Sequence, residues 1–181
     1  MSYTLAAFAV DLGQLQAVFG SQDQSLLKSI MSEQAAEFVS NDRWFKEDLA
    51  PGQPSLREAL EQIVTGQLHP VAGSGFQYGY ATELLCRHLG IEIPTEELVF
   101  VSELEIDTKL LTSGPPLPTP PPDDFPEIGY LTAEQVAEEF VKFSHLGEIE
   151  SGDDFTPARH EYVNLLDEAK QNHLGLVTFT Y

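Results

Sequence analysis

The chain has 181 residues, of which 42% are hydrophobic and 21% charged, a composition that suits one folded domain and excludes a disordered chain. Asp and Glu outnumber Lys and Arg by 29 to 9, so the net charge is −20, which disfavours binding to nucleic acid or to an anionic membrane surface. The one cysteine excludes an intramolecular disulfide, and no apolar run reaches the roughly 18 residues of a membrane span. The first residues lack the basic and apolar stretches of a secretory signal, so we expect a cytoplasmic protein.

The first third of the chain predicts a strand followed by helices. Residues 4–10 are apolar and read as a buried strand, after which Asp11 is placed to cap a helix over 12–18. Ser21 and Gln24 have capping-box spacing, and apolar residues then recur at helical intervals to about residue 39. We expect 41–52 to be irregular, with Trp44 and Phe45 covering part of the core.

The middle third predicts two further helices and weaker elements. Ser55 and Glu58 form a second capping box, and its helix should end at Gly66 in the left-handed conformation. After a loop and the string at 76–80, residues 81–89 have a helical apolar stripe that Gly90 should stop. We also expect a strand over 97–101 and a helix from 102 to about 111.

Prolines separate this part from the last third, since seven of the twelve lie in 114–126, which should form an extended surface connector. Thr132 and Gln135 form another capping box for a helix to about residue 143. Thr156 and Pro157 then suit a helix start, and 176–181 alternate as a strand with one covered face should. The whole predicts a single α+β domain over 1–181, with about six helices packed on a small sheet that includes both terminal strands.

Motifs for nucleotide, metal or nucleophile chemistry are missing from the sequence. The Gly-Ser-Gly at 73–75 lacks the Lys and the strand–turn–helix context of a phosphate-binding loop or a nucleophile elbow. No two histidines stand at i and i+4, and Cys86 lies in an apolar helical stretch, where a buried inert thiol is expected. We therefore name no catalytic residue, no metal ligand and no cofactor, and we leave open whether the protein is an enzyme.

One local cluster is a candidate ligand-binding surface. Aromatic residues surround Gly79 at the entrance of a helix, and polar groups follow one and two turns later. A packing corner explains the same residues, with Gly79 allowing close approach of a neighbouring element. The candidate residues are Phe76, Gln77, Tyr78, Tyr80, Glu83, Arg87 and His88.

The strings at 75–81 (GFQYGYA), 84–90 (LLCRHLG) and 121–132 (PPDDFPEIGYLT) resemble those of a family of uncharacterised bacterial proteins. More distantly, 130–136 and 165–181 resemble the YfbM-like family, which is also small, bacterial and of unknown activity. The resemblance implies an α+β fold in a bacterial cytoplasm and transfers no catalytic residue.

The charge distribution motivates the first functional hypothesis. Residues 1–90 carry 10 acidic and 5 basic side chains, whereas 91–181 carry 19 and 4. Such polarity favours a non-enzymatic module that binds a basic protein partner, for example in the manner of an immunity protein, although solubility alone also explains acidity. The alternatives are an enzyme or ligand-binding protein with a pocket near 76–80 and, last, a mimic of DNA charge. The oligomeric state is left open.

Overall fold

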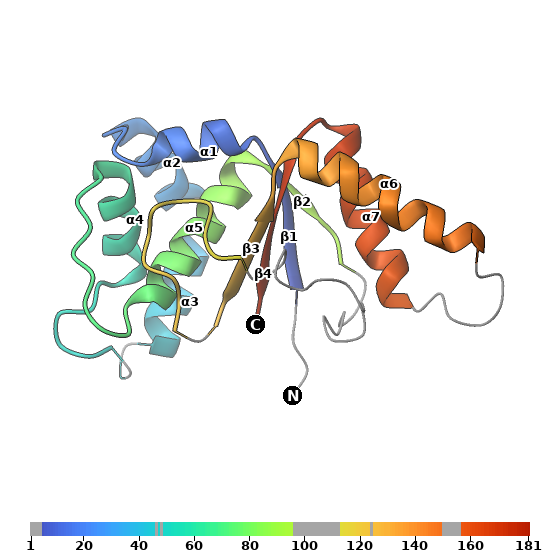
Figure 1. Ribbon diagram of the computed structural model, residues 1–181. Coiled ribbons are helices and arrows are strands. Elements are labelled where there is room, and N and C mark those ends of the chain that lie inside the picture. Colours follow the sequence, from blue (N-terminus) through green and yellow to red (C-terminus); the bar gives the residue numbers. More distant parts are fainter. Residues whose placement is uncertain (1–4, 46, 48, 96–112, 124, 150–156) are drawn as a thin grey trace.

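The computed structural model describes residues 5–45, 47, 49–95, 113–123, 125–149 and 157–181. In these residues there are seven helices and a four-stranded sheet, which confirms the predicted α+β domain (Figure 1). The strand expected over 97–101 and the helix expected from 102 lie outside the described residues, as does Thr156.

The sheet is antiparallel throughout and has the order β2-β1-β4-β3. Its two central strands are β1 (Leu5–Val10) and β4 (Gly175–Thr180), which pair along their whole length, from Leu5 opposite Thr180 to Val10 opposite Gly175. The expectation that both terminal strands share one sheet is confirmed. The edge strands β2 (Ile91–Ile93) and β3 (Glu127–Leu131) were not predicted, because each is short and follows a stretch that reads as a turn.

Helices cover both faces of the sheet, so the last strand is buried on both sides rather than on one (Figure 1). Phe8, Val177 and Phe179 belong to the core on the side of α1 (Leu12–Val18), α2 (Gln24–Glu33), α3 (Ala35–Phe45), α4 (Leu56–Thr65) and α5 (Gly75–Leu89). Ala7 and Leu176 belong to the core on the side of α6 (Ala133–Ile149) and α7 (Pro157–Gln171). The alternation of apolar residues with threonines in this strand predicted one covered face, but Thr178 and Thr180 on the other face are buried as well. Their β-branched side chains suit a packed strand.

Several helix starts agree with the capping predictions. Asp11 accepts hydrogen bonds from the backbone N–H groups of Gly13 and Gln14, at 2.9 and 3.1 Å. The box of Ser55 with Glu58 is complete, and Gly66 ends α4 with a φ of +71°. At these positions, local hydrogen bonding was therefore sufficient to predict where the helix begins or ends.

The helix predicted from Ser21 to residue 39 is instead two helices. Asp23, not Ser21, caps α2, and its carboxylate accepts from the N–H groups at 25 and 26. The chain breaks at Gln34, whose buried amide donates to the carbonyl of Leu84 on α5 at 2.9 Å. This tertiary hydrogen bond fixes the turn between α2 and α3.

The third helix of this layer continues through residues expected to be irregular, as far as Phe45. Trp44 was expected to cover core, yet 74% of its surface is exposed. Phe45 points the other way and packs on the rings of Phe76 and Tyr80. Whether an aromatic residue near the end of a helix is buried or exposed thus depends on its neighbours in the tertiary structure.

The proline segment lies against α5 (Figure 1). A Cβ on Gly75 would stand 2.1 Å from the carbonyl oxygen of Pro121, and one on Gly79 would stand 3.1 Å from the ring of Pro126. Leu117 of the same segment is buried in the core. The close approach of Pro121 requires glycine at residue 75. Helix α5 begins at this glycine, so the string at 76–80 belongs to the helix rather than preceding it, as had been predicted.

Candidate functional site

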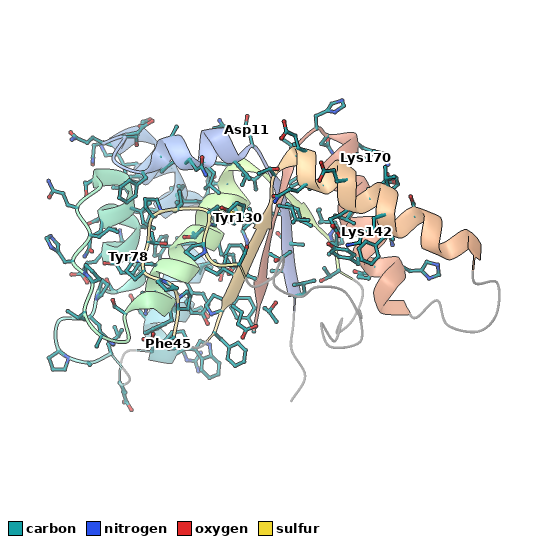
Figure 2. All side chains as sticks on the ribbon, viewed as in Figure 1. Asp11, Phe45, Tyr78, Tyr130, Lys142 and Lys170 are labelled. Carbon is teal, nitrogen blue, oxygen red and sulfur yellow. The ribbon has the colours of Figure 1, made fainter. Side chains whose placement is uncertain are left out.

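Four aromatic rings gather where α3, α5 and the residue after β4 meet. Phe45 lies 5.2 Å from Phe76 and 5.5 Å from Tyr80, measured between ring centroids. Tyr181 stacks on Tyr80 with 5.8 Å between centroids and 25° between planes. In Figure 2, Phe45 lies at the lower edge of the helical layer, whereas Tyr78 lies within that layer. The four rings form one continuous aromatic surface.

Two adjoining pockets open on this aromatic surface and share Phe45, Tyr80 and Tyr181. The larger has a volume of about 840 Å³ and the smaller about 550 Å³. Both lie in the range of small-molecule sites in proteins. The remaining residues of the larger pocket are Glu37, Ser40, Asn41, Trp44, Leu56, Glu83, Leu84 and Arg87, and those of the smaller are Gln53, Gly73, Phe76, Asp123 and Phe125.

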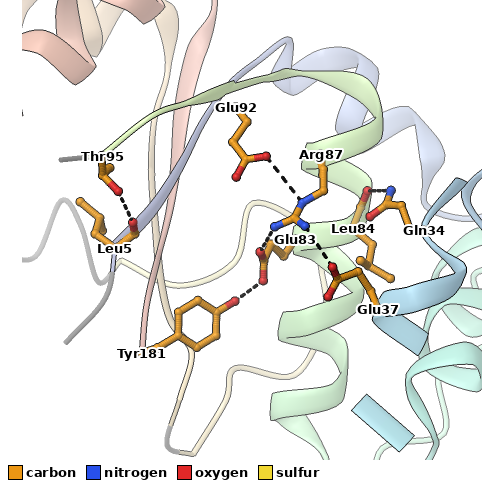
Figure 3. Close-up of polar contacts among 9 residues, drawn as sticks. All are labelled: Leu5, Gln34, Glu37, Glu83, Leu84, Arg87, Glu92, Thr95 and Tyr181. Atoms are coloured by element: carbon orange, nitrogen blue, oxygen red, sulfur yellow. Dashed lines mark hydrogen bonds and ion pairs between the residues drawn. The ribbon is translucent and has the colours of Figure 1, made fainter. Parts of the chain in front are cut away.

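A chain of polar contacts runs along the wall of the larger pocket (Figure 3). The hydroxyl of Tyr181 donates a hydrogen bond to Oε2 of Glu83, and Nη2 of Arg87 donates to Oε1 of the same carboxylate at 2.9 Å. The other guanidinium nitrogens of Arg87 face Glu37 at 3.5 Å and Glu92 at 3.9 Å. Residues 83 and 87 meet because they are four apart on one helix. One arginine thus faces three carboxylates.

Burial shifts the acid–base properties of this wall. Only 9% of Glu83 is exposed, and desolvation raises the pKa of its carboxyl group above the ordinary value, more than Tyr181 and Arg87 lower it. Burial and the nearby Glu83 likewise raise the pKa of Tyr181, and burial raises that of Tyr80. Both tyrosines therefore keep their hydroxyl protons at neutral pH.

The predicted site residues divide into two groups. Tyr80, Glu83 and Arg87 line the larger pocket, and Phe76 and Tyr80 line the smaller one. The other three are elsewhere: Gln77 and Tyr78 are fully buried, and the imidazole Nδ1 of His88 lies 2.8 Å from Glu33 Oε2.

Two side chains of α5, Tyr78 and Cys86, are buried in the core and offer no exposed functional atom. The hydroxyl of Tyr78 donates a hydrogen bond to Gln62 Oε1 on α4 at 2.5 Å, so this tyrosine joins two helices of the core. Cys86 is buried as expected, and desolvation raises the pKa of its thiol, which disfavours the reactive thiolate.

Sequence reasoning missed the site residues that come from outside α5. Phe45 and Glu37 are contributed by α3, and Tyr181 follows β4. A signal existed for Tyr181, because the alternation of the last strand places it on the same face as Val177 and Phe179. No local pattern marked Phe45 or Glu37 as neighbours of Tyr80.

Comparison with known proteins gives a family without an assigned activity. One family model, described as a domain of unknown function (DUF7691), matches residues 1–181. The chain belongs to the DUF7691 family. No curated protein and no solved structure matches it. The likeness to a family of unknown function is thereby confirmed at that level, whereas the more distant YfbM-like relationship stays a prediction.

Within the described residues, none of the DUF7691 helices combines the length and apolarity that crossing a bilayer requires. The same part of the chain holds no cluster of three His, Cys, Asp or Glu side chains that could bind a metal ion.

Proposed function

We propose that this DUF7691 chain binds a small molecule that carries a flat aromatic ring and a positive charge, in the two pockets around Tyr80. The observation that carries the proposal is the pair of adjoining pockets that share Phe45, Tyr80 and Tyr181. Pockets built from several aromatic rings with a few polar groups are typical ligand sites.

The aromatic part of the ligand follows from the ring geometry. Tyr80 and Tyr181 already stack nearly parallel, and Phe45 and Phe76 are tilted beside them. A planar ligand that adds to this cluster gains offset or edge-to-face contacts with rings that are already positioned. An aliphatic ligand of equal size gains only the burial of its surface.

The positive charge follows from the carboxylates. Glu37 and Glu83 line the larger pocket and Asp123 lines the smaller one. The cation among these lining residues, Arg87, already faces three carboxylates, which leaves the lining net acidic. Aromatic faces also attract cations, so both kinds of group favour the same ligand charge.

Binding suits the polar groups better than turnover does. Both oxygens of Glu83 already accept hydrogen bonds, one from Arg87 and one from Tyr181, and these partners hold the carboxyl group in the pocket wall. His88 lines neither pocket and pairs with Glu33. We therefore assign Glu83 an electrostatic role and propose a binding protein.

Isothermal titration with matched probes tests this function. Tryptamine carries both an indole ring and a positive charge. Indole-3-acetate carries the same ring with a negative charge, and hexylamine carries the positive charge without a ring. We expect tryptamine to bind about tenfold or more tightly than either of the others. Equal or tighter binding of indole-3-acetate would contradict the proposed charge, and absence of binding by all three would contradict the proposed class.

A pair of variants locates the binding. Tyr80→Leu keeps apolar volume but removes the ring, and should weaken tryptamine binding about tenfold. Tyr130→Leu is the matched control, because Tyr130 is a partly buried tyrosine of the same core that lines neither pocket. Equal weakening in both variants would show that the effect is structural.

The protein-binding role expected from the net charge is a separate proposal, because it requires an exposed surface rather than a pocket.

A further inference from the structure

The outer side of α3 exposes apolar side chains to solvent. Val39 is 69% exposed and Trp44 is 74% exposed, the two most exposed large hydrophobic residues in the described part of the chain. Together with Ala35, Ala36, Ser40 and Arg43, they line a shallow hollow of about 430 Å³. We call these six residues the α3 face. Exposed tryptophan beside an apolar hollow is typical of a protein–protein contact.

Helical geometry makes the α3 face continuous. With 3.6 residues per turn, its six residues fall on one half of the helix, and Phe38 and Asn41, which are buried, fall on the other half. The apolar side chains of Val39 and Trp44 on the outer half are therefore mostly exposed to solvent, whereas the opposite half of the helix packs on the core.

Carboxylates border this face on both sides. The same helical spacing places Glu37 at one edge and Asp42 at the other, and both are exposed. Glu33 lies just before the helix and Glu47 just after it, and both are also exposed. Arg43 is the one cation of the face among the described residues. An apolar strip with an acidic border complements a partner with the reverse charge pattern.

A second copy of the chain does not supply that pattern. The net charge of −20 and the acidic border would bring like charges together in a symmetric dimer. We propose that the α3 face binds a basic amphipathic helix of a partner protein, with apolar side chains against Val39 and Trp44 and Lys or Arg beside Glu37 and Asp42. Helices recognise such grooves through apolar residues at helical spacing.

Trp44 reports this contact directly, because it is the only tryptophan in the chain. The probe is a tryptophan-free peptide of about 14 residues, four helical turns, with Leu on one face and Lys on the other. Its binding should move the emission of Trp44 to shorter wavelength as the indole is buried, and should weaken as salt rises from about 0.1 to 0.5 M. A peptide with Glu in place of Lys should leave the emission unchanged.

One pair of variants separates apolar docking from general charge attraction. Val39→Asp removes an apolar contact and adds negative charge, so it should weaken the Leu–Lys peptide by about tenfold, whereas charge attraction alone would strengthen binding. Val141→Asp makes the same change at a valine that is 52% exposed on α6, on the other side of the sheet, and should not weaken binding.

Three results would overturn the proposal. They are an unchanged Trp44 emission with the Leu–Lys peptide, equal or tighter binding by Val39→Asp, and a spectral shift that depends on protein concentration without peptide, which would assign the face to a second copy. Trp44 and Ser40 line both the hollow and the larger pocket, whereas Val39 lines the hollow alone. Val39→Asp should therefore weaken the Leu–Lys peptide and leave tryptamine binding unchanged, which distinguishes the α3 face from the pockets around Tyr80.

Discussion

The two sides of the sheet are covered in different ways. On one side, α6 and α7, of 17 and 15 residues, pack on small strand residues such as Ala7 and Ala9. On the other, five helices of 7 to 15 residues and the proline segment share one core with Phe8 and Phe179, and α5 is the helix that packs on β1 and β2. Figure 2 shows this contrast, with Lys142 and Lys170 on the α6–α7 side and Tyr78 and Phe45 on the other.

This difference between the two sides indicates where a ligand-binding pocket can form in this fold. Where several short helices meet at a junction, their ends diverge and leave room for a pocket. The two pockets around Tyr80 lie at such a junction, between the end of α3, the middle of α5 and Tyr181. We therefore expect a structural role for the α6–α7 side, and the proposed ligand binding on the other side.

The largest expected effect tests the structural role of the α6–α7 side. Leu166 on α7 is fully buried, so Leu166→Ala should lower the free energy of unfolding by about 2 to 5 kcal/mol in urea titrations. Tryptamine affinity, measured at a temperature where the variant is folded, should be unchanged. A parallel loss of affinity would mean that the two sides of the sheet are not independent.

The next effect tests the contact between α5 and the proline segment. Gly75→Ala places a methyl group 2.1 Å from the carbonyl oxygen of Pro121, a backbone atom that cannot move alone, and should destabilise the fold by about 3 kcal/mol. Gly79→Ala meets only proline ring atoms at 3.1 to 3.2 Å, and alanine favours the helix, so its cost should be about 1 kcal/mol or less. Urea unfolding of the two variants gives the order, and a reversed order would contradict this packing.

The smallest effect is a pH dependence that arises at Glu83. Its pKa is raised above the ordinary 4.5, so between these two values the folded chain binds more protons than the unfolded chain. The contribution of Glu83 to the free energy of unfolding therefore falls as pH rises through this interval. Gln at this position does not titrate, so the Glu83→Gln variant should not show this fall. The free energy of unfolding of the variant, relative to that of the parent protein, should therefore increase as pH rises above 4.5.

Glu33→Gln is the control of opposite sign for that experiment. Hydrogen bonds from Ser29 and His88 lower the pKa of Glu33, so its stabilising contribution is present above 4.5 and is lost as pH falls through the lowered pKa. Relative to the parent protein, Glu33→Gln should therefore lose stability as pH rises. The same trend in both variants would contradict the assigned environment of Glu83.

Local chemistry made much of the fold predictable. Ser55 with Glu58, Asp11 and Gly66 act through neighbours in sequence, and the structure has each where the pattern placed it. The break at Gln34 depends on Leu84, fifty positions away, and no local pattern contains that contact. Strand β2 is three residues long and depends on its pairing with β1.

The site was half predictable for the same reason. Tyr80, Glu83 and Arg87 share one helix, so their spacing alone brings them together. Phe45 and Tyr181 reach Tyr80 only through the packing of α3 and β4 around α5. Tyr78 resembles Tyr80 in sequence, yet it faces Gln62 in the core, and that difference is set by tertiary structure.

Mapping tryptamine by amide chemical shifts tests the central claim most directly. In a two-dimensional NMR titration, we expect shifts that saturate at Phe45, Phe76, Tyr80, Glu83 and Tyr181, and none in α6 and α7. Indole-3-acetate at the same concentrations should leave these amides unchanged. Saturating shifts confined to α6 and α7, or no saturation anywhere, would contradict a ligand site on the α5 side of the sheet.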